Sequence, residues 1–224
     1  MTQQQTAHPP VVMVMGPPGS GKGTQAQAAL ERFGMERIET GALIRSMRDD
    51  PSPLARRVTE LYDAGRLSPP PLIAEFVIRE VRRILQSGKG IVFDGSPRTL
   101  AEAELLLAAL KEDHVERILV VVLDVPKPET VERVLQRWIC VDCTRPISSP
   151  STPEACRACG GKFTRRPDDT ADVMENRWEE FTFRTLPVIE YFERRGLAVR
   201  VNGSRPIPEV TKDVQQLLAE RLYQ

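Results

Sequence analysis

A short apolar run that leads into a glycine-rich loop is the feature that most constrains the fold of this chain. VVMVM, residues 11–15, is followed by GPPGSGKGTQ, residues 16–25, and by a helical pattern that ends at Gly34. Glycines let the backbone of such a loop turn its N–H groups toward phosphate oxygens, and the helix that follows adds its positive end. The order strand, glycine loop, helix therefore predicts a nucleotide-binding α/β protein.

The loop departs from its usual pattern at one position. A phosphate loop normally places Ser or Thr directly after the lysine, where the hydroxyl meets magnesium. Here Gly23 follows Lys22, and the first hydroxyl, that of Thr24, comes one residue later. We expect Lys22 to supply a mobile positive charge to the terminal phosphates. The residues predicted to bind the phosphates are Gly19, Ser20, Gly21, Lys22, Gly23 and Thr24.

Further apolar runs indicate a parallel sheet. They lie at 90–95, 117–125 and 197–203, with a weaker candidate near 36–39, and helical patterns alternate with them at 75–88, 100–112 and 210–222. This alternation predicts an open, doubly wound parallel sheet of five strands with right-handed crossovers. Two segments do not fit it. Residues 40–70 are polar and helix-like, and residues 138–169 are rich in Pro, Cys and Arg, so we expect insertions at the carboxyl edge of the sheet, where such folds bind ligands.

Composition excludes several classes of function. Lys and Arg number 31, as do Asp and Glu, so no bulk charge draws the chain to nucleic acid or to a membrane. The two histidines argue against Ser-His-Asp or His-metal catalysis. No apolar run reaches the roughly 18 residues of a membrane span, and the first residues do not resemble a secretory signal. We expect a monomeric, cytoplasmic protein with small-molecule substrates.

The four cysteines form two pairs, Cys140 with Cys143 and Cys156 with Cys159, each separated by two residues. This spacing is typical of a tetrahedral thiolate zinc site, which has no open position and is structural rather than catalytic. Two disulfides or a redox-active pair are the alternatives. The lack of an export signal favours a reducing compartment and therefore zinc.

Six motifs carry a resemblance to a known family. GPPGSGKGTQ, ETGALIR (39–45), DAGRLS (63–68), DGSPRT (94–99), RRPDD (165–169) and NRW (176–178) occur in the order seen in adenylate kinases, and the similarity runs from about residue 11 to 206. A glycine after the loop lysine is normal in that family. The resemblance implies magnesium-dependent phosphoryl transfer from ATP to AMP, giving two ADP. It divides the chain into a core (11–39, 69–131, 170–224), an acceptor-binding subdomain (40–68) and a zinc-binding lid (132–169).

The resemblance also implies roles for individual residues. Asp94 would position waters of the magnesium ion, where the family has a second Asp at the position of Ala42. The acceptor nucleotide would lie against Thr40, Arg45, Arg66, Leu67, Ser68, Gly95, Ser96, Pro97, Arg98 and Glu102. Arg133, Arg137, Arg166 and Arg177 would surround the transferring phosphoryl group, with Arg205 among the residues that bind ATP. Arg133 and Arg137 are four residues apart, so we expect both on one helix face. Such chemistry needs positioning and charge neutralisation rather than a general base.

Glu102 stands where the family usually has Gln, and Ser96 replaces a common aromatic residue. An ionised carboxylate only accepts hydrogen bonds. It suits the donors of guanine or the amino group of cytosine better than the mixed edge of adenine. Either Glu102 points to solvent and the backbone of 66–68 selects adenine, or acceptor choice is relaxed toward GMP, CMP or UMP. A non-catalytic zinc-ribbon module switched by nucleotide is the alternative from a different class.

Overall fold

The computed structural model describes residues 9–40, 43, 46–63, 70–143, 145–167 and 169–223. Its centre is a five-stranded parallel sheet in the order β2–β3–β1–β4–β8. The strands are β1 (Val11–Met15), β2 (Glu36–Ile38), β3 (Ile91–Asp94), β4 (Ile118–Asp124) and β8 (Ala198–Asn202). The predicted sheet is confirmed, including the weak strand near 36–39.

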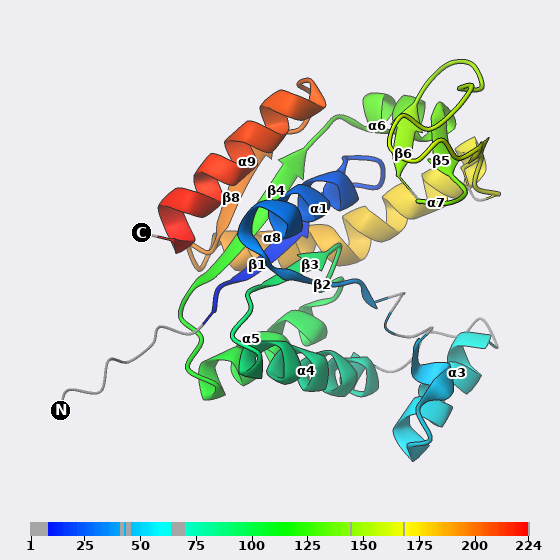
Figure 1. Cartoon of the computed structure of the whole chain (residues 1–224). Coiled ribbons are helices and arrows are strands. Elements are labelled where there is room, and N and C mark those ends of the chain that lie inside the picture. The colour runs from blue at the N-terminus through cyan, green and yellow to red at the C-terminus, as the bar shows by residue number, and fades with distance from the viewer. Residues whose placement is uncertain are drawn as a thin grey trace.

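Helices cover both faces of this sheet (Figure 1). The helices in the described part of the chain are α1 (Lys22–Phe33), α3 (Pro53–Asp63), α4 (Pro70–Gln86), α5 (Leu100–Glu112), α6 (Lys127–Leu135), α7 (Ala171–Glu180), α8 (Leu186–Glu193) and α9 (Ile207–Leu222), with a short turn η1 (Met47–Asp49) and a π-helical turn η2 (Phe181–Thr185) between α7 and α8. Of these, α3 lies away from the sheet (Figure 1). No helix in the described part of the chain is both long and apolar enough to pass through a bilayer.

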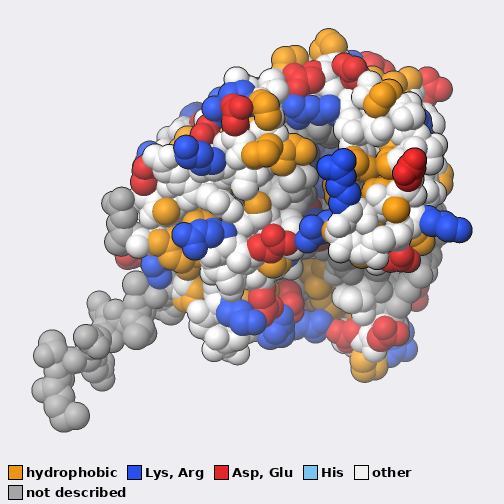
Figure 2. Space-filling view, turned by 45° about the horizontal axis from the view of Figure 1, so that its top comes forward, with side chains coloured by type: hydrophobic (Ala, Val, Ile, Leu, Met, Phe, Trp, Pro, Cys, Tyr) orange, Lys and Arg blue, Asp and Glu red, His pale blue; other side chains and the backbone are white. Residues whose placement is uncertain are grey.

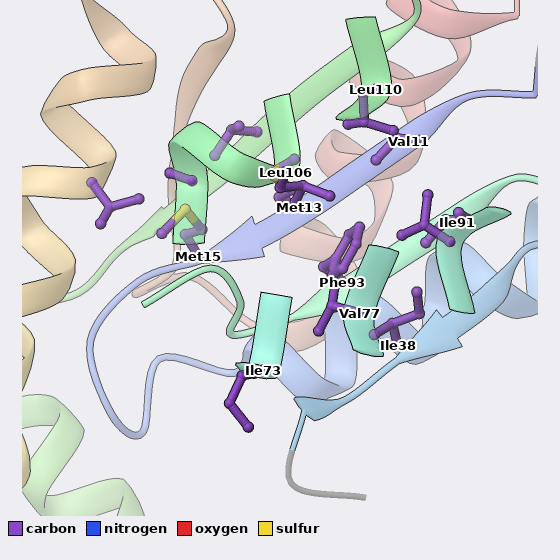
Figure 3. Close-up of a cluster of buried hydrophobic side chains, with 14 of the residues drawn as sticks. Val11, Met13, Met15, Ile38, Ile73, Val77, Ile91, Phe93, Leu106 and Leu110 are labelled. Carbon is purple, nitrogen blue, oxygen red and sulfur yellow. The ribbon is translucent and has the colours of Figure 1, made fainter. Parts of the chain in front are cut away.

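Strand β1 is buried along its whole length, and its side chains alternate between two cores. Val11, Met13 and Met15 pack with side chains of α4, α5 and α8. Figure 3 shows these three residues among Ile73 and Val77 of α4 and Leu106 and Leu110 of α5. The intervening valines of β1 pack with α1 and α9 on the other face. A strand covered on both faces reads as a continuous apolar run, which is why the sequence pattern predicted it.

A second, antiparallel sheet has the order β6–β5–β7. Its strands are β5 (Arg137–Cys140), β6 (Pro146–Ser148) and β7 (Phe163–Thr164). This small sheet was not predicted from the sequence. In Figure 1, β5 and β6 lie at the upper right and α3 at the lower right, both beyond the same side of the parallel sheet.

The small sheet corrects one prediction. We expected Arg133 and Arg137 on one helix face, but α6 ends at Leu135, and Arg137 begins β5, where it pairs with Ser148. The helical spacing of VERVLQRW continues past the end of the helix, because strand pairing with a distant segment takes over at residue 137.

Candidate active site

The glycine loop joins the carboxyl end of β1 to α1, as predicted. Gly21 precedes the helix with φ 95°, a left-handed conformation that favours glycine, and no side chain caps the first N–H groups of α1. A Cβ atom on Gly19 would lie 2.6 Å from the carbonyl oxygen of Thr130. The hydroxyl of Ser20 is buried and has no hydrogen-bond partner among the described residues. A buried hydroxyl without a partner is costly, so this loop is shaped to receive oxygen atoms such as those of a triphosphate.

Lys22 lies at the start of α1 and spans the loop. Its Nζ atom donates hydrogen bonds to the carbonyl oxygens of Gly16 (2.9 Å) and Pro17 (2.7 Å). Burial lowers the pKa of Lys22 to about 8; Asp94 opposes this shift, while the positive charges of Arg98 and Arg137 add to it. Residues far apart in the sequence therefore lie within electrostatic reach of one amino group.

Gly23 has a physical reason to lack a side chain. A Cβ atom there would lie 3.2 Å from Oδ2 of Asp94 and 3.6 Å from Nη2 of Arg37. The space that a Ser or Thr hydroxyl fills in other phosphate loops is thus bordered by the carboxylate of Asp94, at the end of β3. Magnesium is often held by one or two carboxylates together with substrate phosphates and waters. Asp94 can serve in such a site.

Thr40 and Ser96 bring the acceptor segment to the carboxyl end of β3. Their hydroxyl groups share a hydrogen bond, and Ser96 is buried. The Ser96–Pro97 peptide bond is cis. Thr40, Ser96, Pro97 and Glu102 border a small cavity whose remaining walls are apolar side chains of α4, β3 and α5. Arg98 follows, exposed, and its Nε atom donates to the carbonyl oxygen of Gly95 (3.1 Å).

Glu102 is partly exposed at the start of α5 and also borders the small cavity. Its Oε2 atom accepts a hydrogen bond from the backbone N–H of Arg98 (2.8 Å), while its own N–H donates to Oγ1 of Thr99 (3.3 Å). Thr99 is the N-cap of α5, so the two side chains satisfy backbone donors at the start of the helix in a variant of the capping box. The bond from Arg98 uses Oε2 and leaves Oε1 as the other oxygen of the Glu102 carboxylate.

Arg137 and Arg177 meet at one buried acid. Arg137 donates from Nε and Nη2 to the two carboxylate oxygens of Asp169, and the Nε bond is 2.8 Å long. Nη1 of Arg177, on α7, lies 4.0 Å from Oδ1 of the same carboxylate, whose side chain is only 2% exposed. A carboxylate so far from water needs cationic partners. Asp169 thereby fixes a guanidinium from the small sheet beside one from α7.

The other predicted arginines in the described part of the chain have partners of their own or are exposed. Arg133, on α6, donates to the carbonyl oxygen of Gly203 (2.9 Å) and pairs with Glu129. Arg205 pairs with Asp213, and its buried Nε has no partner among the described residues. Arg166 is exposed in the turn before α7. Figure 2 shows Lys and Arg side chains beside a hollow in the face of the molecule that it displays.

Five of the predicted positions lie outside the described residues: Ala42, Arg45, Arg66, Leu67 and Ser68. Conversely, sequence reasoning assigned no role to Arg37 or Asp169. Asp169 lies in the RRPDD motif, and a search for the partner of each basic residue would have singled it out. Arg37 carried no such signal, because only the parallel register of β2 and β3 places it beside Asp94.

The four cysteines converge as predicted. Their Sγ atoms all lie within 4.8 Å of one another, with Cys140 and Cys159 separated by 3.4 Å and Cys143 and Cys156 by 3.6 Å. Tetrahedral zinc–thiolate bonds of 2.3 Å require sulfur separations of about 3.8 Å, whereas a disulfide requires about 2.05 Å. All four thiols are free, which does not support the disulfide alternative. The cluster can hold a zinc ion.

The thiols of this cluster interact with one another. The backbone N–H of Gly161 lowers the pKa of Cys159, but the neighbouring thiols of Cys143 and Cys140 outweigh it and raise that pKa to about 12. The backbone N–H of Ala158 bonds to the thiol of Cys156 and lowers its pKa to about 7, against the effect of burial. The opposite shifts of Cys156 and Cys159 show that a thiolate on one sulfur holds the proton on its neighbour, and a metal ion would replace such protons. A Cβ atom on Gly161 would lie 2.8 Å from Sγ of Cys140 and would also meet Asp142, so glycine lets the chain pass close to the sulfurs.

The parallel sheet, the glycine loop before α1 and the basic groups at the loop define a phosphate-binding α/β protein of the P-loop class. A family model described as adenylate kinase matches residues 14–197. The chain belongs to the adenylate kinase family. It is 34% identical to an adenylate kinase of Novosphingobium aromaticivorans, over 94% of this chain and 99% of that protein. It is also 34% identical to an adenylate kinase of Archaeoglobus fulgidus (92% and 97%) and 32% identical to one of Carboxydothermus hydrogenoformans (92% and 98%).

Proposed function

We propose that the protein catalyses the reversible, magnesium-dependent transfer of the terminal phosphoryl group of ATP to AMP, which gives two ADP. Its membership of the adenylate kinase family makes it a phosphotransferase. The observation that carries the proposal is the position of Lys22 between the loop carbonyls and the charges of Asp94, Arg98 and Arg137. That arrangement suits a reaction whose main requirement is the neutralisation of phosphate charge.

In this proposal the triphosphate of ATP lies along the backbone N–H groups of residues 19–24, and Ser20 supplies its unpartnered hydroxyl. Lys22 leaves the carbonyl oxygens of Gly16 and Pro17 for the terminal phosphates. Arg205 lies on the ATP side. Magnesium would supply further neutralisation of phosphate charge, and Asp94 would help to hold it through its waters.

The acceptor AMP would lie against Thr40 and Arg98, with its base toward the cavity that Ser96, Pro97 and Glu102 border. Arg137 and Arg177, held by Asp169, would face the transferring group. A phosphate monoester oxygen is already anionic near neutral pH, so its attack needs orientation rather than removal of a proton.

Residues 40–68 and 132–169 are proposed to act as an acceptor-binding subdomain and a lid that close over the two nucleotides. Closure excludes water, which would otherwise receive the phosphoryl group. The zinc ion would hold the lid in shape and would leave no open coordination position for catalysis. We also propose a cytoplasmic monomer. The equal numbers of basic and acidic residues argue against a nucleic-acid or membrane partner.

A coupled assay of ADP formation from ATP and AMP tests the proposal directly. We expect turnover that depends on magnesium and on AMP, with lower kcat/KM for GMP, CMP and UMP. Absence of ADP formation by protein that binds ATP would favour the nucleotide-switched module instead. Neither that module nor a kinase for another monophosphate is favoured by the similarity to adenylate kinases.

A further inference from the structure

Arg37 lies beside the side-chain position from which other phosphate loops contact their metal ion. In those loops the residue after the lysine carries a hydroxyl that binds magnesium. In this chain that residue is Gly23, and the atoms nearest to its missing side chain are Oδ2 of Asp94 and Nη2 of Arg37. A permanent positive charge therefore lies next to the side-chain position from which other phosphate loops bind a divalent cation.

The guanidinium of Arg37 has two acidic neighbours. Nη2 forms an ion pair with Oδ2 of Asp94 and lies 3.6 Å from Oε2 of Glu39. The side chain of Asp94 is 12% exposed and that of Glu39 is 43% exposed, so Glu39 is the more solvated partner. Only one nitrogen of Arg37 is in the pair, and its Nε has no hydrogen-bond partner among the described residues. The guanidinium is thus not locked to Asp94 in the bidentate manner of Arg137 and Asp169.

This arrangement has an electrostatic consequence. A carboxylate that is paired with a guanidinium has one oxygen occupied and its charge neutralised, so it attracts a divalent cation less strongly. A metal ion that arrives with ATP would also repel the guanidinium. Glu39 offers Arg37 a second carboxylate without a large movement of the backbone.

We propose that Arg37 determines how much free magnesium the reaction requires. It is the counter-ion of Asp94 in the metal-free protein and moves to Glu39 when the metal binds with ATP. Arg37 is a positioning residue in this scheme, because it acts on the metal through Asp94. This inference rests on the proposed function, in which Asp94 binds the waters of the magnesium ion.

Binding of Mn²⁺, measured by electron paramagnetic resonance, tests the proposal without turnover. Mn²⁺ is titrated into the zinc-loaded protein with the β,γ-imido analogue of ATP. Arg37→Gln is expected to tighten Mn²⁺ binding by about threefold to tenfold, and Glu39→Gln to weaken it by a similar factor, as for removal of one partly exposed ion-pair partner. Arg83→Gln is the matched control, because Arg83 pairs with Glu36 (2.9 Å), the neighbour of Arg37 on β2. It should leave Mn²⁺ affinity unchanged.

Unchanged or weaker binding by folded Arg37→Gln protein would overturn the proposal. If Arg37→Gln does not fold, the Glu39→Gln variant tests the proposal instead. Unchanged or tighter Mn²⁺ binding by Glu39→Gln would show that Glu39 does not receive Arg37, and the proposal would be wrong. Asp94→Asn separates the two proposals. If it leaves Mn²⁺ affinity unchanged, the role of Arg37 fails, whereas ADP formation from ATP and AMP still decides the reaction. If the variants change Mn²⁺ affinity as expected but the wild type forms no ADP, the proposed reaction is wrong and the role of Arg37 in metal binding is supported.

Discussion

The carboxylate of Asp169 accepts two hydrogen bonds from the guanidinium of Arg137, one on each oxygen. Asp169 precedes α7 and Arg137 begins β5. The pair therefore connects the small sheet to the helix that carries Arg177. Bidentate pairs of this kind fix orientation as well as distance. The pair determines where two of the predicted arginines point.

Asp169→Asn should therefore lower kcat more than it raises KM for ATP. The amide keeps the shape of the carboxylate but loses its charge and one acceptor, so Arg137 is oriented less well. We expect kcat to fall by about tenfold to a hundredfold, and the free energy of unfolding by about 1.5–3 kcal/mol, the range for a hydrogen bond to a charged group. Asp172→Asn, an exposed change in the first turn of α7, is the control. A kcat within twofold of wild type would remove Asp169 from this role.

Lys22→Ala should abolish transfer and leave the fold intact. The shape of the loop comes from its glycines and from the start of α1, whereas the ammonium group acts on phosphate charge. Loss of one such group costs about a hundredfold or more in rate. Circular dichroism and the coupled assay measure the two parts of this prediction, with Lys89→Ala, a surface lysine paired to Glu36, as the control. Retention of more than about a tenth of the activity would show that the transferring site is elsewhere.

Binding of ATP should take up a proton above about pH 8. The pKa of Lys22 is about 8 in the ATP-free protein, below its ordinary value of 10.5, so the amine is largely neutral at pH 9. The phosphates of ATP favour the charged amine and raise its pKa again. Calorimetry at pH 9 in buffers of different ionisation enthalpy should detect an uptake that is nearly absent at pH 7 and in Lys22→Ala. Equal uptake in wild type and Lys22→Ala would assign the proton to another group.

The same shift predicts the pH dependence of stability. Because the folded pKa lies below the unfolded one, the unfolded chain binds more protons between about pH 8 and 10.5. The contribution of Lys22 to the free energy of unfolding therefore rises with pH across this window. Urea denaturation at several pH values measures this contribution. The free energy of unfolding of wild type, minus that of Lys22→Ala, should increase from about pH 8 to about pH 10.5.

Removal of zinc should loosen the small sheet without unfolding the core. The four sulfurs join segments on both sides of β6, while the parallel sheet has its own two apolar cores. Elemental analysis of reduced protein should find about one zinc per chain, as one tetrathiolate site requires. Chelation should lower Tm but leave the far-ultraviolet signal of the core at room temperature. Freshly purified protein without zinc would contradict the assignment.

The sequence predicted those features that depend on local pattern. The apolar runs at β1, β3 and β4 and the glycine loop are visible in a window of a few residues, and each was placed correctly. The small antiparallel sheet was missed because its strands are two to four residues long, and β6 is exposed throughout. Arg37 and Asp169 were missed because their roles come from partners at the ends of other elements. Such contacts depend on sheet register and burial, which one sequence does not display.

Glu102 provides the sharpest test of acceptor selection. Its Oε2 atom is already held by the N–H of Arg98, so only Oε1 is available to the neighbouring cavity. With one oxygen held in this way, the carboxylate cannot form two parallel hydrogen bonds, one on each oxygen, to N1–H and N2–H of guanine, which weakens the reason for expecting GMP. It can still accept from the single amino group at N6 of adenine.

Glu102→Gln should therefore lower the preference for AMP over GMP. The amide oxygen would keep the bond from Arg98, because that N–H needs an acceptor, and the NH₂ group would turn to the cavity. An NH₂ group donates, so it meets O6 of guanine as well as N1 of adenine and no longer accepts from N6. We expect the ratio of kcat/KM values for AMP and GMP to fall by about tenfold, within the 1–3 kcal/mol typical of base readout. Glu104→Gln, an exposed change on the same helix, is the control. A ratio that stays within twofold of wild type would mean that Glu102 only caps α5.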